Sequence, residues 1–320
     1  MEIITTIFTN AFYVLVFPGL LFVAIVGLLL AGIDRKVLAR MQKRVGPPLI
    51  QPFYDFFKLM GKETIIPHAA NRRVFLAAPV VGFVSLVVMM LFIPIFGFSP
   101  LSTNADLIIL LYLLTIPAVA LIVGGSASGS PYAGIGISRE MVTMMAYELP
   151  LVIVLLTVAR KVGGSTLCFS LSEISLFQQA EGSLITNWSL IPAAIAMLLV
   201  IPAEVGTQPF DVAEAETEIC EGPLVEYSGA PLAIFKLNTA IKMFIMTALF
   251  TVLFFGGIDT GFIALNALVL VAICAVLTVI CMTLIHAICA RLKIEHLFKF
   301  YWTVVTVLAA ISLILVWLGL

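Results

Sequence analysis

The sequence predicts an all-α integral membrane protein, a bundle of about eight transmembrane helices with one amphipathic interfacial helix. Three observations predict it: 62% of the 320 residues are hydrophobic, only 11% are charged, and the mean hydropathy is +1.18. A soluble domain is about 45–50% apolar and about 25% charged. This chain cannot cover its own surface with polar groups, so its solvent must be lipid. A soluble enzyme, a disordered protein and a nucleic-acid-binding protein are excluded, and residues 1–320 are expected to form a single polytopic domain.

A helix that crosses the ~30 Å hydrocarbon layer needs about 20 apolar residues. Eight segments meet this requirement, at 10–33, 74–97, 106–124, 140–159, 186–203, 233–257, 262–289 and 302–319. Proline interrupts several of them, which membrane helices tolerate where neighbouring groups satisfy the freed carbonyls. These spans leave four loops on one side of the membrane, at 34–73, 125–139, 204–232 and 290–301.

The basic residues predict the orientation of the bundle. Thirteen of the 17 Lys and Arg residues lie in these four loops, whereas the loops on the other side hold only Arg160 and Lys161. Lys and Arg concentrate in cytoplasmic loops. We therefore expect a multi-pass protein of the cytoplasmic (plasma) membrane, with the four loops in the cytoplasm and both termini outside.

The first of these loops carries the predicted interfacial helix. Residues 46–48, Gly-Pro-Pro, interrupt any preceding helix. Apolar side chains then recur at i, i+3, i+4 and i+7, at Phe53, Phe56, Phe57 and Met60. Asp55, Lys58 and Lys62 lie on the opposite face, which is typical of a helix lying in the membrane interface. This helix is either a simple anchor or also the mouth of a lateral binding cavity.

The loop at 204–232 is acidic and contains no Lys or Arg. Its seven acids are Glu204, Asp211, Glu214, Glu216, Glu218, Glu221 and Glu226. If the loop is helical, Asp211, Glu214, Glu218 and Glu221 share one face. Crowded carboxylates repel one another, so some should have raised pKa values and hold protons near neutral pH. The acids therefore form either a row of proton acceptors or a docking surface for a basic partner.

A few ionisable residues fall inside predicted spans or at their ends. Glu148, Lys236 and Lys242 lie within spans, and Glu140 lies at the entrance of the fourth. A charge at the centre of a membrane helix costs at least ~2.5–3.5 kcal/mol, so it is rare without a function. Glu140 and Glu148 are eight residues apart, which is about 12 Å along a helix. They are either stations on a proton route, with Lys242 as a further relay, or Glu148 forms a buried ion pair with one of the lysines.

Several stretches resemble the quinone-cavity membrane subunit of complex I, the NADH:quinone oxidoreductase. These stretches are DRKVLARMQ at 34–42, RVGP at 44–47, PFDVAEAE at 209–216, EYSG at 226–229, and Arg139 followed by Tyr147-Glu148. Other stretches are more similar to the membrane subunit of the ion-translocating group 4 [NiFe]-hydrogenases. They are GSPY at 129–132, SREM at 138–141, EGPLVEYSG at 221–229, Lys236, and ARL at 290–292. Thr207 stands where complex I usually has Arg, which speaks against a bound quinone head group. Archaeal sulfane-sulfur reductases share the architecture.

The resemblance implies a coupling subunit without a redox centre, cofactor or metal of its own. The five cysteines show no CxxC spacing, so the residues likewise predict no iron–sulfur or zinc site. The implied partners are a [NiFe]-hydrogenase-like large subunit, an iron–sulfur small subunit with [4Fe-4S] clusters, and antiporter-like membrane subunits that move H⁺ or Na⁺. Ferredoxin is the implied electron donor. A quinone-cavity subunit, or the equivalent subunit of a sulfane-sulfur reductase, is the alternative.

Two groups of candidate site residues follow from the acids and from the resemblance. The proposed proton relay consists of Glu140, Glu148, Glu204, Asp211, Glu214, Glu216, Glu218, Glu221, Glu226, Lys236 and Lys242. The proposed contact with the peripheral arm consists of Arg35, Arg40, Arg44, Asp55, Lys58 and Arg139. No catalytic, cofactor-binding or metal-binding residue is assigned.

Overall fold

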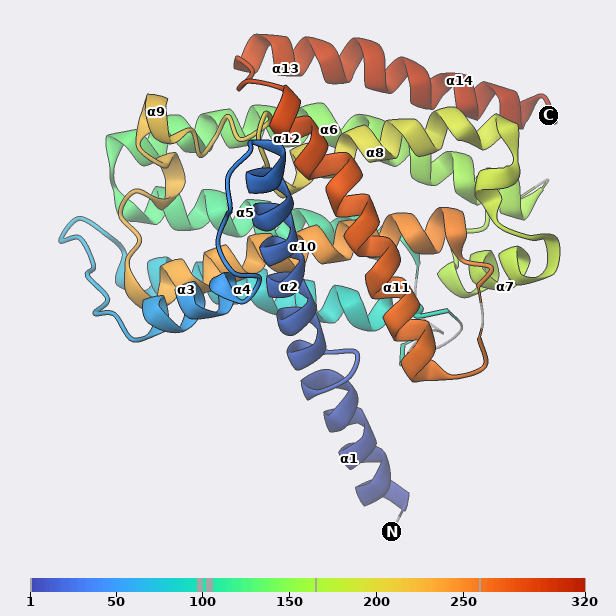
Figure 1. Ribbon diagram of the computed structural model, residues 1–320, viewed down its shortest axis with the longest axis horizontal. Helices are drawn as coiled ribbons and strands as arrows, with labels where there is room; N and C mark the ends of the chain where they lie inside the picture. The colour runs from blue at the N-terminus through green and yellow to red at the C-terminus, as the bar shows by residue number, and fades with distance from the viewer. Residues whose placement is uncertain (1, 97–99, 102–105, 165, 259, 320) are drawn as a thin grey trace.

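A computed structural model describes residues 2–96, 100–101, 106–164, 166–258 and 260–319 (Figure 1). Helices dominate these residues, and β-structure within them is limited to isolated bridge positions, among them a bridge between Asp106 and Ser170. Eight helical segments are long and apolar enough to cross a membrane. The predicted fold class, an all-α integral membrane protein with about eight spans, is confirmed.

The helices follow one another along the chain in three groups. The first half of the chain forms α1 (Glu2–Leu15), α2 (Leu20–Met41), α3 (Gln51–Met60), α4 (Arg72–Phe92), α5 (Leu107–Ser128) and α6 (Pro131–Gly163). The middle forms α7 (Leu171–Glu181), the 3₁₀ turns η2 (Leu184–Thr186) and η3 (Trp188–Leu190), α8 (Ile191–Val205), α9 (Glu216–Ile219) and the turn η4 (Gly222–Leu224). The rest forms α10 (Gly229–Phe255), α11 (Ile263–Thr278), α12 (Leu284–Ile288), α13 (Ile294–Phe300) and α14 (Thr306–Trp317), with π-helical segments η5 (Val279–Thr283) and η6 (Tyr301–Val305).

Helix α10 is the centre of the bundle. It packs against α2, α3, α4, α8 and α11, and 94% of its most apolar stretch is buried, against 28% for the last span. In Figure 1, α4, α5, α6, α8 and α14 run in roughly the same direction as α10, while α2 and α11 cross them steeply and α1 projects from the body. A polar group within this buried stretch of α10 is therefore surrounded by protein rather than lipid.

The predicted boundaries of two loops are wrong. Only Gly129 and Ser130 separate α5 from α6, so most of the predicted loop 125–139 is helical. Serines make this stretch look like a loop, but the Ser128 hydroxyl donates to the Gly125 carbonyl at 2.6 Å, and such local bonds are compatible with a helix. Similarly, α13 already begins at Ile294, so the predicted loop 290–301 is much shorter. Glu140 consequently lies inside α6 rather than at its entrance.

The acidic loop is mostly irregular, so the conditional helix through Asp211 and Glu221 does not form. Between the end of α8 and the start of α10, α-helix is confined to α9, and the four acids expected on one face do not share one. Cys220, Glu221 and Gly222 all have positive φ angles, of 52°, 68° and 51°, which ends the helix because L-residues rarely adopt this conformation. At Gly222 a Cβ would lie 2.2 Å from the Ala213 carbonyl oxygen, so only glycine fits this close approach.

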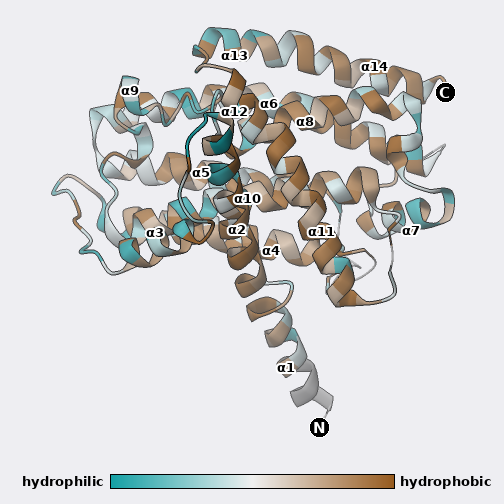
Figure 2. Cartoon of the chain, viewed as in Figure 1, coloured by the Kyte–Doolittle hydropathy of each residue, from teal (hydrophilic) through white to brown (hydrophobic). Residues whose placement is uncertain are grey.

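The amphipathic helix after the Gly-Pro-Pro break is confirmed as α3. Phe53 and Phe56 pack against the core, whereas Phe57 and Met60 on the same predicted face remain 68% and 45% exposed. Figure 2 shows polar residues gathered at the end of the bundle that carries α3, α9 and the start of α13. We call this the loop end.

Tyr227 anchors the acidic loop to the bundle. Pro79 lies inside α4 and has no N–H to bond the Phe75 carbonyl one turn earlier. The buried Tyr227 hydroxyl donates to that carbonyl at 3.1 Å, and its ring stacks on Phe75 with centroids 3.9 Å apart. Gly124 makes room, since a Cβ there would lie 2.5 Å from the hydroxyl.

The eighth span, which contains α13, η6 and α14, is fixed to the bundle in a similar way. The fully buried Tyr301, in the π-helical segment η6, donates its hydroxyl to the Leu199 carbonyl of α8 at 2.7 Å. Its ring also meets the edge of Phe210 in the acidic loop, with centroids 5.4 Å apart. Tyr301 thus joins the eighth span, α8 and the loop at one point.

Tyr227→Phe should destabilise the protein, because it leaves the buried Phe75 carbonyl without a donor, at a cost of about 1–3 kcal/mol. Thermal unfolding of the purified membrane complex, followed by tryptophan fluorescence, measures this as a lower midpoint. Tyr54→Phe is the matched control, since Tyr54 is 60% exposed. Equal midpoints for the two variants would contradict the anchoring role.

Candidate functional site

A buried ion pair lies in the core of the bundle. The Lys242 ammonium on α10 is 2.7 Å from Oε1 of Glu204, the penultimate residue of α8, and the two side chains are only 10% and 2% exposed. The Tyr147 hydroxyl on α6 donates a further hydrogen bond to Glu204. Burying two charges is costly, and the cost is offset only by close pairing and additional hydrogen bonds. Both conditions hold here.

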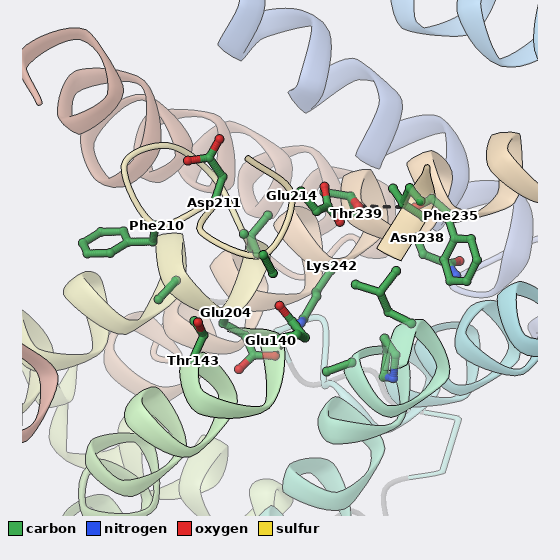
Figure 3. Close-up of a pocket in the computed structure, with 18 residues that line it drawn as sticks. Glu140, Thr143, Glu204, Phe210, Asp211, Glu214, Phe235, Asn238, Thr239 and Lys242 are labelled. Atoms are coloured by element: carbon green, nitrogen blue, oxygen red, sulfur yellow. Dashed lines mark hydrogen bonds and ion pairs between the residues drawn. The ribbon is translucent and has the colours of Figure 1, made fainter. Parts of the chain in front are cut away.

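Other acids surround this pair. Glu140 and Glu148, both on α6, lie within electrostatic reach of Glu204 and Lys242. Figure 3 shows Glu140, Glu204 and Lys242 together at the centre of a pocket, with Asp211 and Glu214 of the acidic loop beyond them. The structure thus brings five predicted relay residues to one cavity: Glu140, Glu204, Asp211, Glu214 and Lys242.

The cavity between these residues is small. Its volume is about 60 Å³, whereas a water occupies about 30 Å³ and pockets for organic ligands enclose about 300–1,000 Å³. Within this chain, the cavity therefore suits water, protons and the ends of side chains rather than an organic molecule. Among the described residues, no group of His, Cys, Asp or Glu is placed to hold a metal ion.

Two acids of the loop are paired with arginines from other elements. Arg291 donates through Nε and Nη2 to Asp211 Oδ2, at 3.0 and 2.9 Å, and through Nη1 to the Thr217 hydroxyl at 3.0 Å. Arg139 on α6 lies 2.6 Å from Glu218 and donates to the Val212 carbonyl at 3.3 Å. These two arginines clamp the loop to the bundle, and they supply the positive charges that the loop itself lacks.

Glu214 has the property expected of a proton acceptor. Burial and the neighbouring carboxylates of Glu140, Glu221 and Asp211 raise its pKa from 4.5 to about 7. Burial is the largest cause, since it penalises the charged form. The sequence attributes raised pKa values in this loop to crowded carboxylates, whereas burial is the larger cause at Glu214.

The remaining predicted relay residues do not line the cavity. Glu216 is exposed, Glu221 and Glu226 are part-buried, and Lys236 is exposed on the early turns of α10. The alternative of an ion pair between Glu148 and a lysine is wrong for Lys242, whose partner is Glu204. Lys236 forms no salt bridge with a described residue, although it lies within electrostatic reach of Glu214.

Most of the predicted peripheral-arm residues lie exposed at the loop end. Arg35 pairs with Asp55 of α3 at 2.8 Å, with both side chains about half exposed. Arg44 donates to the Gln42 side chain, and Arg40 and Lys58 are exposed. Arg139 differs from them, because it is part-buried and clamps the acidic loop.

Sequence reasoning missed four residues of the site. The sequence identifies Tyr147 and Arg291 only as parts of motifs, without a role in the site. The cavity is also lined by Thr143 and Asn238. A usable signal exists for Asn238, because it lies four residues before Lys242 and so on the same face of a helix.

The fold and these buried charges define a class: a multi-pass helical membrane protein with an ion pair and further acids in its core. Residues 13–317 match the family model described as NADH dehydrogenase. The chain is 37% identical to hydrogenase-4 component C of Escherichia coli (strain K12) over 227 residues, or 71% of this chain and 70% of that protein. It is 35% identical to a subunit of the NADH-quinone oxidoreductase of Bordetella pertussis, over 70% of this chain and 66% of that protein.

A solved structure is also similar along nearly the whole chain. It belongs to the membrane-bound sulfane sulfur reductase, an archaeal respiratory membrane complex, with a TM-score of 0.84 and 33% identity over 92% of this chain and 96% of that chain. The chain belongs to the NADH dehydrogenase family. This agrees with the resemblance to complex I and to the hydrogenase branch that the motifs indicate.

Glu214 should titrate near neutral pH, because its pKa of about 7 leaves it half protonated there. Infrared spectra of the purified complex should show a protonated carboxyl C=O band that disappears as pH rises through this value and that is absent in Glu214→Gln. The exposed Glu216→Gln is the matched control and should keep the band. The folded state binds this proton more tightly than the unfolded state, so the group costs stability as pH rises from 4.5 through about 7. A band unchanged by Glu214→Gln would contradict the assignment.

Proposed function

We propose that this chain is the membrane-anchoring and coupling subunit of an ion-translocating respiratory complex of the membrane-bound [NiFe]-hydrogenase type. It links redox chemistry in a peripheral arm to H⁺ or Na⁺ translocation through its buried carboxylates. The observation that carries the proposal is the buried Lys242–Glu204 pair, which lies near further acids and borders a cavity of about 60 Å³. The family supports it, because relatives at 35–37% identity are named as components of a hydrogenase and of an NADH-quinone oxidoreductase.

The energetic cost of the buried charges supports a functional role. A buried ion pair contributes little to stability, and apolar residues of similar volume often replace it without loss. Titratable groups inside a membrane bundle commonly mark proton or ion pathways. A buried Lys242–Glu204 pair with the part-buried Glu140 and Glu148 in electrostatic reach of it is hard to explain as a device for anchoring alone.

The proposed route begins at the acidic loop. Glu214 can take up and release protons near neutral pH, and it borders the same cavity as Glu140, Glu204 and Lys242. Glu148 lies two turns further along α6 than Glu140 and within reach of Glu204 and Lys242. Protons would pass from the loop through the cavity to this cluster and on to the antiporter-like subunits.

The acidic loop is the element through which the peripheral arm would act. Arg139 and Arg291 hold it from two sides, and Asp211 borders the cavity while its Oδ2 is bound to Arg291. A shift of the loop would therefore change the charges around the cavity directly. The exposed residues Arg35, Arg40, Arg44 and Lys58 at the same end would contact the arm.

The identity of the catalytic subunits in the complex distinguishes the hydrogenase type from its alternatives. We propose a [NiFe]-hydrogenase-like large subunit and an iron–sulfur small subunit with [4Fe-4S] clusters as partners, and ferredoxin as electron donor. The solved sulfane sulfur reductase chain, which this chain matches over 92% of its length, supports the equivalent subunit of such a reductase as the second candidate. A quinone-cavity subunit is less well supported, because Thr207 stands where complex I usually has Arg. The large subunit that co-purifies distinguishes these candidates.

Glu148→Gln should assemble into the complex and keep its redox turnover, but ion transport per turnover should fall by about a hundredfold, because the amide cannot exchange the proton. The measurement is ion uptake into inverted membrane vesicles during substrate-driven turnover. Glu295→Gln is the matched control, since Glu295 is exposed on α13 outside the acid cluster. Wild-type transport in both Glu148→Gln and Glu204→Gln would refute the proposed route.

A further inference from the structure

Asn238 on α10 leaves a polar atom without a partner. Its Nδ2 donates to the Pro79 carbonyl at 3.0 Å, but its Oδ1 is buried and receives no hydrogen bond from the described residues. The residue is only 6% exposed. An unsatisfied buried acceptor costs about 1–3 kcal/mol, so such atoms are rare in folded proteins.

The orientation of this amide is fixed. A flipped amide would place Oδ1 against the Pro79 carbonyl oxygen, and two acceptors repel each other. The glycine at position 82 brings α4 close, since a Cβ there would lie 3.0 Å from Asn238 Nδ2. Asn238 therefore keeps a hydrogen-bond acceptor available at one place on α10.

Lys242 lies one helical turn beyond Asn238 on α10. Four residues correspond to about 6 Å along the helix, and helical side chains lean toward the N-terminus over the preceding turn. Both residues line the cavity of about 60 Å³ shown in Figure 3. The ammonium group is about the size of a water, so this cavity gives it room to move.

We propose that Asn238 is a positioning residue and that its Oδ1 is the second acceptor of the Lys242 ammonium. When a proton binds the Glu204 carboxylate, that side chain becomes neutral and its hold on Lys242 weakens. The ammonium keeps its own proton and charge, and turns to Asn238 Oδ1. When the proton leaves Glu204, Lys242 returns to the carboxylate. This inference rests on the proposed function, because it assigns Glu204 a proton-carrying role.

Because charged groups surround Lys242, movement of its ammonium affects the protonation of the neighbouring acids. Glu140 and Glu148 on α6 and Glu204 on α8 all act on the space that Lys242 occupies, and Glu214 borders it from the loop. Asn238 is nearer the N-terminal, loop end of α10 than Lys242 is. Movement toward Asn238 therefore carries positive charge toward the loop end, where it favours the ionised form of the acids there. Proton binding at Glu204 would thus assist proton release on the loop side.

The direct test is the position of Lys242 in a high-resolution electron cryomicroscopy structure of the whole complex carrying Glu204→Gln, which mimics the protonated carboxyl. We expect Nζ of Lys242 within about 3 Å of Asn238 Oδ1. The matched control, Glu148→Gln, should leave Lys242 paired with Glu204, as at 2.7 Å here. An ammonium that stays on the side chain at position 204, or that moves to Glu140, overturns the proposal.

A second measurement tests the proposal without relying on Glu204→Gln. Asn238→Leu should lower ion transport per turnover by about a hundredfold without lowering redox turnover, because it removes the positioning acceptor. Asn266→Leu is the matched control, since Asn266 is a buried asparagine on α11 that does not line this cavity. Wild-type transport in Asn238→Leu overturns the inference. If Glu148→Gln and Glu204→Gln abolish transport while Lys242 does not move, the proposed function stands and only this inference fails.

Discussion

The buried Lys242–Glu204 ion pair places two requirements on the whole bundle. Both charges lie in the core, so the fold must keep lipid away from them and satisfy their hydrogen bonds. Helix α10 meets the first requirement, because protein surrounds it on nearly every side. Tyr147 contributes to the second by donating to Glu204. Loss of one partner leaves an unpaired buried charge at a cost of about 3–5 kcal/mol, whereas loss of both is far less costly. The pair is thus a poor source of stability and a sensitive site for a change in protonation.

The acidic loop connects this pair to the exposed loop end. Tyr227 ties one part of the loop to the carbonyl that Pro79 frees in α4, and the arginines at positions 139 and 291 tie the other. Phe210 of the same loop contacts Tyr301, which is bonded to the carbonyl of Leu199 on α8, five residues before Glu204. The loop is therefore mechanically continuous with the helix that carries Glu204. In the proposed function, this continuity transmits the state of the peripheral arm to the buried acids.

The sequence predicts the spans and the interfacial helix well, because both depend on local composition and period. The apolar runs identify the eight spans, and the spacing of Phe53 and Phe56 identifies α3. The charge of Lys242 inside a span is equally local and predicts a special site. Its partner is not local: composition places Glu204 at the start of a loop, yet it lies in the last turn of α8. The bond between Arg291 and Asp211 joins two loops 80 residues apart, and no period in the sequence reveals it. The unpaired Asn238 oxygen depends on how α4 packs against α10 at Pro79, so it emerges only from the assembled bundle.

In the proposed function, the buried pair carries protons rather than holding the bundle together. The most direct test replaces both partners at once, with Glu204→Gln and Lys242→Met, because the double variant leaves no unpaired charge and should assemble normally. The quantity to measure is the number of ions transported per substrate turned over, in vesicles containing the whole complex. We expect normal assembly and normal redox turnover, with ion transport lost. Wild-type transport per turnover in the assembled double variant would contradict it.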